Sequence, residues 1–292
     1  MTTLIADSGS TKTDWVLMEG PSTTARIQTQ GINPVHQPAE VIGRVLTGEL
    51  LPHLGGAAPA AIYFYGSGCT PATSPLLEQV LGRVFTDTSA IEVQGDLIGA
   101  ARALLGHRAG MACILGTGAN SCLYDGQRIV ANTPPLGFIL GDEGSGAVLG
   151  KHFLNAIFKG FLPQWMRDEY LSTAGLTYPD VIEKVYRQPM ANRFLASTAA
   201  FIATHTDFGP LRTMVVENFR EFFRRNLNPY HAQEHEASFV GGIAYQFAPL
   251  LNEAALAEGY TVGRIMKSPI DGLVEYHSGA SPIGQRKHPQ PE

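Results

Sequence analysis

Two short stretches of the chain carry residues suited to phosphate chemistry. The first is Leu4–Glu19, LIADSGSTKTDWVLME, and the second is Cys113–Asp125, CILGTGANSCLYD. Each predicts a β-hairpin, because a turn rich in Gly, Ser and Thr separates two apolar runs. Small turn residues let backbone N–H groups point inward and form a nest for phosphate oxygens. Asp7, at the end of the first run, is suited to hold a hydrated divalent cation beside those phosphates.

The two hairpins lie about a hundred residues apart, with Ser8-Gly9 aligned on Thr117-Gly118. Ordinary turn chemistry is the alternative for either hairpin alone, but the pair favours a duplicated domain that closes on a nucleotide from both sides. Other phosphate loops do not fit. The Gly-x4-Gly-Lys frame of a Walker loop is missing around Gly9, and Ser121 occupies the third glycine position of a dinucleotide fingerprint.

Composition limits the class of protein. The chain has 292 residues, 44% of them hydrophobic and 16% charged, which allows two soluble domains with their own cores. The net charge of −5 and the lack of a basic run argue against nucleic-acid or membrane partners. Three cysteines without C-x-x-C spacing indicate a reducing compartment and no structural zinc. With no leader sequence and no long apolar run, a cytoplasmic protein is expected.

Apolar periodicity predicts the elements that must position this chemistry. After the first hairpin, the first half alternates strands with helices, which implies parallel pairing and right-handed crossovers. The predicted strands are Ala25–Gln30, Ala60–Tyr65 and Ile91–Gln94, and the predicted helices are Pro38–Leu51, Ser74–Phe85 and one that opens at Gly95-Asp96.

The same order restarts near Gly110. The second hairpin is followed by a strand at Arg128–Ala131, a helix at Gly144–Phe158 and a helix-rich region. Further predictions are a helix at Leu211–Leu227, a strand at Ala237–Val240, a helix at Ile243–Glu258 and a strand at Val262–Met266. The polar tail, Gly279–Glu292, is expected to be disordered.

Ligands of open α/β sheets bind beyond the carboxyl ends of the strands. The polar residues expected at those ends should line one cleft between the two domains. They are Asp7, Asn33, Ser67, Asp96, Thr117, Asn120, Asp142 and Glu143.

Asp96 directly follows a predicted strand and opens a helix. It could be a plain helix N-cap, a position that Asp fills well. The neighbouring phosphate hairpins favour catalysis instead, since a carboxylate beside a substrate hydroxyl can accept its proton during phosphoryl transfer.

Two further motifs have a structural and a functional interpretation. Asp142 and Glu143, within GDEGSG, could cap a helix or form a bidentate clasp for sugar hydroxyls. Gly241-Gly242 could be a tight turn between a strand and a helix, or it could let an adenosine ring lie on the backbone.

These motifs resemble those of the actin-like ATPase and sugar kinase superfamily. The closest resemblance is to the BadF/BadG-type branch, which contains N-acetylglucosamine kinases and bacterial N-acetylmuramic acid kinases. It covers nearly the whole chain, through IADSGSTKTDW, GINP, CILGTGANS, PLGFILGDEGSGAVLGK, YRQPMANRFLA and IMKSPIDGLVEYH. The segments GTGAN and GDEGSG are specific when they occur together in this order.

The resemblance implies a role for each matching position. Asp7 would organise Mg²⁺, and Asp96 would be the base on the sugar 6-hydroxyl. ATP phosphates would contact Gly9, Ser10, Thr11, Lys12, Thr117 and Gly118, while Gly241 and Gly242 would border the adenosine. The N-acetyl sugar would be held by Asn33, Ser67, Gly68, Asn120, Asp142 and Glu143.

The implied fold class is α/β, a two-domain actin-like ATPase with duplicated ribonuclease H-like domains and a central cleft. The expected domains are 1–108, joined by a C-terminal helix at 269–278, and 109–268. The implied activity is ATP-dependent phosphorylation of N-acetylglucosamine or N-acetylmuramic acid by a cytoplasmic homodimer, in amino-sugar salvage or peptidoglycan recycling. His36 is the one nearby group that could meet the lactyl carboxylate of N-acetylmuramic acid.

The sequence leaves two alternatives to a sugar kinase. An ATPase that activates a dehydratase needs exposed cysteines for a shared iron–sulfur cluster, and only Cys69 is a candidate. A sugar-binding regulator of this fold would carry an additional DNA-binding domain, whereas this chain starts directly with the phosphate hairpin.

Overall fold

The computed structural model describes Thr2–Gly279 except Ser10, and the predicted tail from residue 280 onward lies outside the described residues. The chain divides into two compact units. The first runs to His107 and resumes at Pro269, and the second is Arg108–Ser268. Within the described part, no helix is long and apolar enough to cross a membrane.

The first unit is a five-stranded sheet in the order β3-β2-β1-β4-β5. Strand β1 pairs antiparallel with β2 and parallel with β4. Its strands are β1 (Thr2–Ser8), β2 (Lys12–Glu19), β3 (Ser22–Gln30), β4 (Ala61–Gly66) and β5 (Ala90–Gly95). Its helices are α1 (Ala39–Val45), α2 (Ser74–Val84), α3 (Asp96–Leu105) and α13 (Ile270–Ser278).

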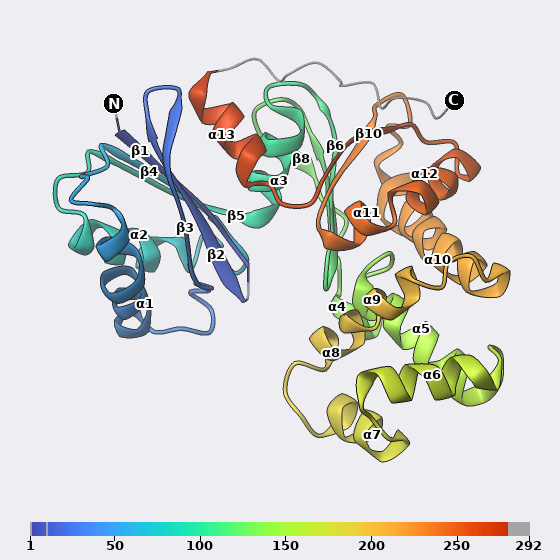
Figure 1. Cartoon of the computed structure of the whole chain (residues 1–292). Coiled ribbons are helices and arrows are strands. Elements are labelled where there is room, and N and C mark those ends of the chain that lie inside the picture. Colours follow the sequence, from blue (N-terminus) through green and yellow to red (C-terminus); the bar gives the residue numbers. More distant parts are fainter. Residues whose placement is uncertain (1, 10, 280–292) are drawn as a thin grey trace. The chain divides into compact units, whose positions relative to one another are not determined.

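Helices cover both faces of this sheet, which explains why β1 is an apolar run rather than an alternating one. Leu4 packs with the side chains of α1 and α2, whereas its neighbour Ile5 packs with α3 and α13. Figure 1 shows α1 and α2 on one side of the sheet and α3 and α13 on the other. The C-terminal helix α13 therefore completes the core of the first unit.

The second unit repeats this topology in its sheet, β8-β7-β6-β9-β10. Here β6 pairs antiparallel with β7 and parallel with β9, as β1 does with β2 and β4. The strands are β6 (Gly110–Leu115), β7 (Ala119–Tyr124), β8 (Ile129–Ala131), β9 (Ala237–Val240) and β10 (Val262–Met266). The duplicated α/β fold predicted from the two hairpins is confirmed.

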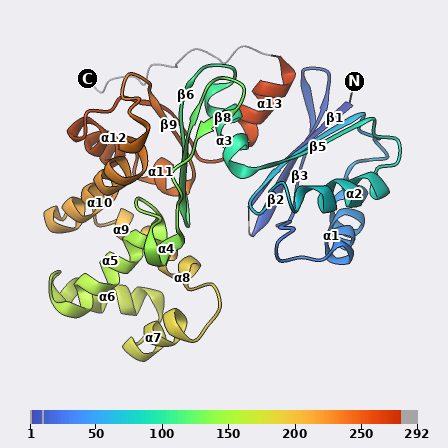
Figure 2. The same ribbon diagram turned by 180° about the vertical axis from the view of Figure 1, so that it is seen from behind.

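The second unit differs from the first by a long helical insertion between β8 and β9. Its helices are α4 (Gly137–Leu140), α5 (Gly146–Lys159), α6 (Gln164–Ala174), α7 (Tyr178–Tyr186), α8 (Ala191–Ser197), α9 (Ala199–Ala203) and α10 (Gly209–Phe222). Within this unit, α6 and α7 lie beyond α5, away from the sheet (Figures 1 and 2). After β9 come α11 (Gly242–Gln246) and α12 (Ala248–Ala257).

Three helix predictions need correction. The helix expected at 243–258 is two helices, because Pro249 in the first turn of α12 has no N–H to continue the ladder past Phe247. The helix expected at 38–51 changes to π-type hydrogen bonding at Leu46–Leu50, and a 3₁₀ turn follows. The helix expected at 211–227 likewise ends in a π-type turn at Phe223–Leu227.

Candidate functional site

Three parallel strands of the first unit end in one row. Ser8 of β1 lies opposite Gly66 of β4, and Gly66 lies opposite Gly95 of β5. The next residues, Gly9, Ser67 and Asp96, therefore leave the same edge of the sheet. Within this unit, the strand register thus brings together the candidates for phosphate binding, for sugar binding and for the catalytic base.

The first hairpin is fastened to the loop that carries Asn33. Its turn is closed by the Gly9 N–H, which donates to the Lys12 carbonyl at 3.0 Å. The buried hydroxyls of Ser8 and Thr13 lie 2.7 Å apart, and both accept from the N–H of Ile32. This network fixes the start of the Asn33 loop against the hairpin.

The charged residues of this hairpin lie close together. Lys12 Nζ contacts the Asp14 carboxylate at 2.8 Å, and Gln28 Nε2 donates to Asp14 at 2.7 Å. Asp7 lies directly opposite Asp14 across the antiparallel pair. The structure thus describes a hairpin with two carboxylates and an ammonium group, together with Thr11, whereas Ser10 lies outside the described residues.

The structure also brings together three residues predicted to bind sugar. Asn33 Oδ1 accepts from the N–H of Val35 at 2.9 Å. Gly68 has a φ of +81°, and a Cβ there would lie 2.3 Å from Asn33 Oδ1, so a larger residue would strain the backbone and displace the Asn33 amide. The N–H of Ser67 donates to the Ser8 carbonyl at 3.1 Å. Asn33, Ser67 and Gly68 therefore share one side of the first hairpin.

Asp96 is not the N-cap of its helix. Gly95 occupies that position, and Asp96 is the first residue of α3. Burial raises the pKa of the Asp96 carboxyl, while hydrogen bonds from the N–H groups of Leu97 and of Asp96 itself lower it. Burial and then the nearby Asp96 charge raise the pKa of the Cys69 thiol to about 12. The Cys69 thiol thus lies close enough to the predicted base for the Asp96 charge to affect its pKa, a proximity that strand spacing alone did not indicate.

The second hairpin is joined to the start of α5. Its turn is closed by the Gly116 N–H donating to the Gly118 carbonyl at 2.9 Å. The carbonyls of Gly116 and Thr117 accept from the N–H groups of Gly146 and Ala147. By strand ends, Leu115 corresponds to Ser8, so the alignment of Ser8-Gly9 with Thr117-Gly118 is displaced by two residues.

Asp142 turns toward this hairpin. Its Oδ1 accepts from the N–H of Ala119 at 3.2 Å, and its φ is +54°. A Cβ on Gly118 would lie 3.0 Å from Asp142 Oδ2. Burial raises the pKa of this carboxyl, opposed by the hydrogen bond from Ala119. The cap of α5 is Ser145, whose Oγ accepts from the N–H of Val148, so the helix-cap interpretation of Asp142 and Glu143 is wrong.

Glu143 and Asn120 have other partners. Glu143 Oε2 accepts from Asn226 Nδ2 at 3.3 Å, and Glu143 Oε1 lies 4.0 Å from Arg225 Nε. Asn120 Oδ1 accepts from Asn132 Nδ2 at 2.9 Å. Asn132 and Asn226 were not predicted. Asn132 could have been found, because it directly follows a strand, but Asn226 lies in a helical segment far along the chain.

The glycine pair lies beside the second hairpin. Gly241 has a φ of +127°, and a Cβ there would lie 2.2 Å from the Leu115 carbonyl oxygen. A Cβ on Gly242 would meet nothing within 4 Å. Gly241 is therefore required for packing, whereas Gly242 leaves open space next to its backbone.

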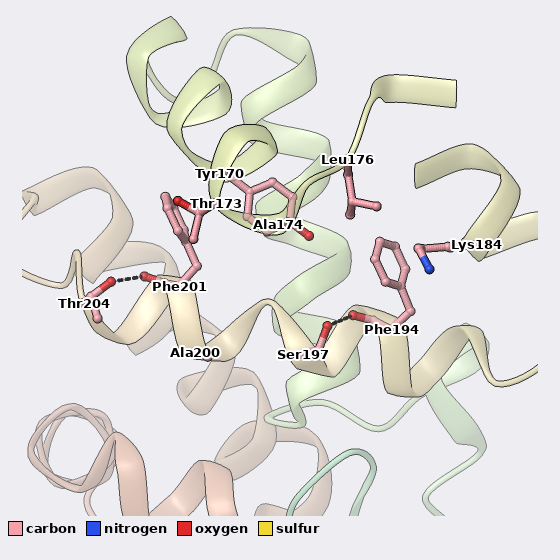
Figure 3. Close-up of a pocket in the computed structure, with 10 residues that line it drawn as sticks. All are labelled: Tyr170, Thr173, Ala174, Leu176, Lys184, Phe194, Ser197, Ala200, Phe201 and Thr204. Atoms are coloured by element: carbon pink, nitrogen blue, oxygen red, sulfur yellow. Dashed lines mark hydrogen bonds between the residues drawn. The ribbon is translucent and has the colours of Figure 1, made fainter. Parts of the chain in front are cut away.

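A separate hollow of about 530 Å³ lies among α6, α7, α8 and α9 (Figure 3). Rings of Tyr170, Phe194 and Phe201 line it, together with Lys184. None of the predicted site residues lines this hollow. That the site residues of the two units face one cleft stays a prediction.

No protein-family model and no curated protein matches the chain. Among solved structures, a putative N-acetylglucosamine kinase from Porphyromonas gingivalis matches with a TM-score of 0.92 and 46% identity, over 95% of this chain and 99% of that one. A putative N-acetylglucosamine kinase from Chromobacterium violaceum matches with a TM-score of 0.70 and 15% identity, over 94% and 98%.

A ROK hexokinase from Thermus thermophilus also shares the fold, with a TM-score of 0.58 and 13% identity, over 96% of this chain and 97% of that one. The 46% identity over nearly the whole length goes beyond a shared fold. The chain therefore belongs to the BadF/BadG-type branch of the actin-like sugar kinase superfamily, the branch of the N-acetylglucosamine kinases.

Proposed function

We propose that this protein is an ATP-dependent kinase that phosphorylates the 6-hydroxyl of N-acetylglucosamine, N-acetylmuramic acid or both. One observation carries the proposal: Asp96, a carboxylate with a raised pKa at the first position of α3, leaves the same sheet edge as the first phosphate hairpin. The similarity to the Porphyromonas gingivalis protein supports an amino sugar as the substrate class.

The nucleotide side of the proposal rests on the hairpins. Lys12 and the turn of Gly9, Ser10 and Thr11 would bind the outer phosphates of ATP, with Thr117 and Gly118 as the contribution of the second unit. Open space beside the backbones of Gly116 and Gly242 agrees with a close approach of phosphate and adenosine.

The donor set around Asp7 fits a magnesium ion. No group of three or more His, Cys, Asp or Glu side chains that could hold a metal occurs within the described residues. Mg²⁺ is commonly held by one or two carboxylates together with substrate phosphates and water. Asp7 would supply one such carboxylate, whereas Asp14 opposite it is engaged by Lys12 and Gln28. When bound, the ion would neutralise charge on the phosphates.

The chemistry assigned to Asp96 is proton acceptance. The oxygen of the sugar 6-hydroxyl forms a bond to the terminal phosphorus of ATP, and the bond from that phosphorus to the bridging oxygen breaks, releasing ADP. The hydroxyl proton passes to the Asp96 carboxylate. The pKa of this carboxyl is raised by burial, which makes it a stronger base than an exposed Asp.

The residues proposed to bind the sugar carry amides, a hydroxyl and carboxylates. Asn33, Ser67 and Gly68 would contribute from the first unit, and Asn120, Asp142 and Glu143 from the second. Such a set suits neutral hydroxyls, whereas two carboxylates would repel an anionic sugar phosphate. His36 is exposed beside Asn33, whose carbonyl accepts from the His36 N–H, so it remains a candidate partner for a lactyl carboxylate.

The alternative, an ATPase that activates a dehydratase through an iron–sulfur cluster, is less well supported. Cys69, Cys113 and Cys122 are all buried and unpaired, whereas a cluster shared between subunits needs surface thiols. Iron analysis of the purified protein separates the two functions. We further propose that the enzyme acts as a cytoplasmic homodimer in amino-sugar salvage or cell-wall recycling, with the oligomeric state measurable by light scattering.

The proposed function is tested by kcat/KM for N-acetylglucosamine, N-acetylmuramic acid, glucose and glucosamine. One or both N-acetyl sugars should be strongly preferred, because a site that pairs the amide penalises its absence. Equal use of glucose would contradict the N-acetyl requirement. If His36→Ala lowered the use of both N-acetyl sugars equally, His36 would have no special role with the lactyl group.

A further inference from the structure

A polar network in the second unit links Asn120 and Glu143 through the loop that follows β8. Asn132 Nδ2 donates to Asn120 Oδ1 at 2.9 Å and to the Ser121 carbonyl at 2.7 Å. A backbone carbonyl only accepts, so this contact fixes which end of the Asn132 amide faces the hairpin. Asn132 was not among the residues singled out from the sequence.

The orientation of the Asn120 amide follows from the same contacts. Asn120 Oδ1 also accepts from the backbone N–H of Ser121 at 2.9 Å. Because its oxygen accepts two hydrogen bonds, the Asn120 amide keeps its Nδ2 group pointing away from these two donors. Among the described residues, none accepts a hydrogen bond from Asn120 Nδ2. Asn120 therefore offers N–H donors to a ligand.

The other end of the network reaches Glu143. Thr133 Oγ1 donates to the Asn226 carbonyl at 2.8 Å, and Asn226 Nδ2 donates to Glu143 Oε2 at 3.3 Å. Asn226 is only 3% exposed. The Thr133 N–H also donates to the Tyr230 hydroxyl at 3.0 Å, which holds the loop in place. An amide donor on one oxygen of Glu143 fixes the carboxylate. The other oxygen lies 4.0 Å from Arg225 Nε, which is too far for a hydrogen bond, so it can still accept from a ligand.

We propose that Asn132 and Asn226 are positioning residues that set the hydrogen-bond polarity of the sugar site in this unit. Asn120 presents donors, and Glu143 presents an acceptor. The matching ligand offers an acceptor oxygen to Asn120 and a hydroxyl proton to Glu143, as a neutral polyol does. A protonated amine, which only donates, is rejected opposite Asn120. This inference rests on the proposed sugar kinase function.

The first test is Asn132→Asp in the full chain. The substitution is nearly isosteric, but it places a carboxylate oxygen against Asn120 Oδ1 and the Ser121 carbonyl, so the Asn120 amide loses its fixed orientation. Loss of such a contact is worth roughly 2- to 10-fold in binding. KM for the sugar should rise by about that factor, while KM for ATP stays unchanged. Asn132→Ala is the second variant, and it should act in the same direction.

The control is Asn252→Asp in α12, where a side-chain amide also donates to a backbone carbonyl, that of Ala248 at 2.8 Å. It should leave both KM values unchanged. In an Asn120→Ala background, Asn132→Asp should no longer affect the sugar KM, because its effect passes through Asn120. A full effect in that background would show a merely structural role and overturn the proposal.

Asn226→Asp tests the second half by a pH profile. It places two carboxylates in contact, and such a pair takes up a proton more readily than a single one. The sugar KM should therefore become more dependent on pH on the acid side, which Asn252→Asp should not cause. An unchanged profile would refute the role of Asn226. If the wild type phosphorylates no sugar, the proposed function fails first; if it does and Asn132→Asp behaves like Asn252→Asp, only this inference fails.

Discussion

Replacement of Asp96 by Asn separates catalysis from folding. The amide is nearly isosteric and keeps an oxygen for the N–H groups of Leu97 and residue 96, but it cannot accept the proton of the sugar hydroxyl. A general base contributes roughly 10²- to 10⁴-fold, equivalent to about 3–5 kcal/mol of transition-state stabilisation. We expect kcat to fall by a factor in that range, with the sugar KM nearly unchanged.

The same substitution should stabilise the protein at neutral pH. Burial raises the pKa of Asp96 above its value in the unfolded chain. The folded state therefore binds the proton more tightly, and stability falls as pH rises from the unfolded pKa toward the folded one. Above that window the ionised carboxylate is a cost that Asn removes. Tm of the variant should exceed that of the wild type at pH 7, and the difference should vanish in acid.

The assay is ADP release under saturating sugar and ATP, with Tm measured by calorimetry on the same samples. Asp87→Asn, an exposed carboxylate in the same unit, is the control and should change neither quantity. In the wild type, the acid limb of kcat/KM should lie at a higher pH than an ordinary Asp carboxyl gives. A variant with near wild-type turnover and a lowered Tm would refute the reasoning and make Asp96 a structural residue.

Three further outcomes are expected. Gly241→Ala should lower the free energy of unfolding by at least about 1–3 kcal/mol, because the residue has a positive φ and its Cβ would meet the Leu115 carbonyl. Gly242→Ala should instead keep Tm and raise KM for ATP. An equal loss of Tm in both variants would contradict this. Lys12→Met should lower kcat/KM for ATP by roughly 10- to 100-fold while changing stability by less than about 1 kcal/mol, since its ion pair is exposed; unchanged ATP kinetics would exclude Lys12 from phosphate binding. Burial, reinforced by the Arg102 charge, lowers the pKa of His277 to about 4. The free energy of unfolding should therefore decline as pH falls from 6.5 toward 4, and this decline should be smaller in His277→Gln. Parallel pH–stability curves for the two proteins would exclude His277 as the cause.

Much of this fold could be predicted because its strongest signals are local. The two hairpins combine apolar runs with turns that few other structures need, and the order of elements after each is repeated. The interruptions of helices were harder to predict. Apolar spacing continues through Phe247, but Pro249 has no N–H to donate to the helical hydrogen-bond ladder. The break therefore follows from a single residue, which the periodicity of apolar residues does not reveal.

The site could be predicted where a residue lies just beyond the end of a strand or within a recognisable motif. Asp96 and Asn33 follow strands, and the register of the sheet brings their segments to one edge. Glu143 was predicted from its motif, but its partner Asn226 lies 83 positions away and is brought to it by tertiary packing. The effect of the Asp96 charge on Cys69 likewise arises because the loop after β4 lies near the start of α3, which no spacing rule describes.

The central claim, transfer of phosphate to the 6-hydroxyl of an N-acetylated sugar, is tested most directly by locating the phosphate on the product. ATP and N-acetylglucosamine are incubated with the enzyme, ADP release is followed, and the product is analysed by two-dimensional proton–phosphorus NMR; N-acetylmuramic acid is treated in the same way. We expect ADP release that depends on the sugar, and phosphorus coupled to the two protons on C6. Phosphorus coupled to the anomeric proton, or ADP release that neither sugar changes, would contradict it.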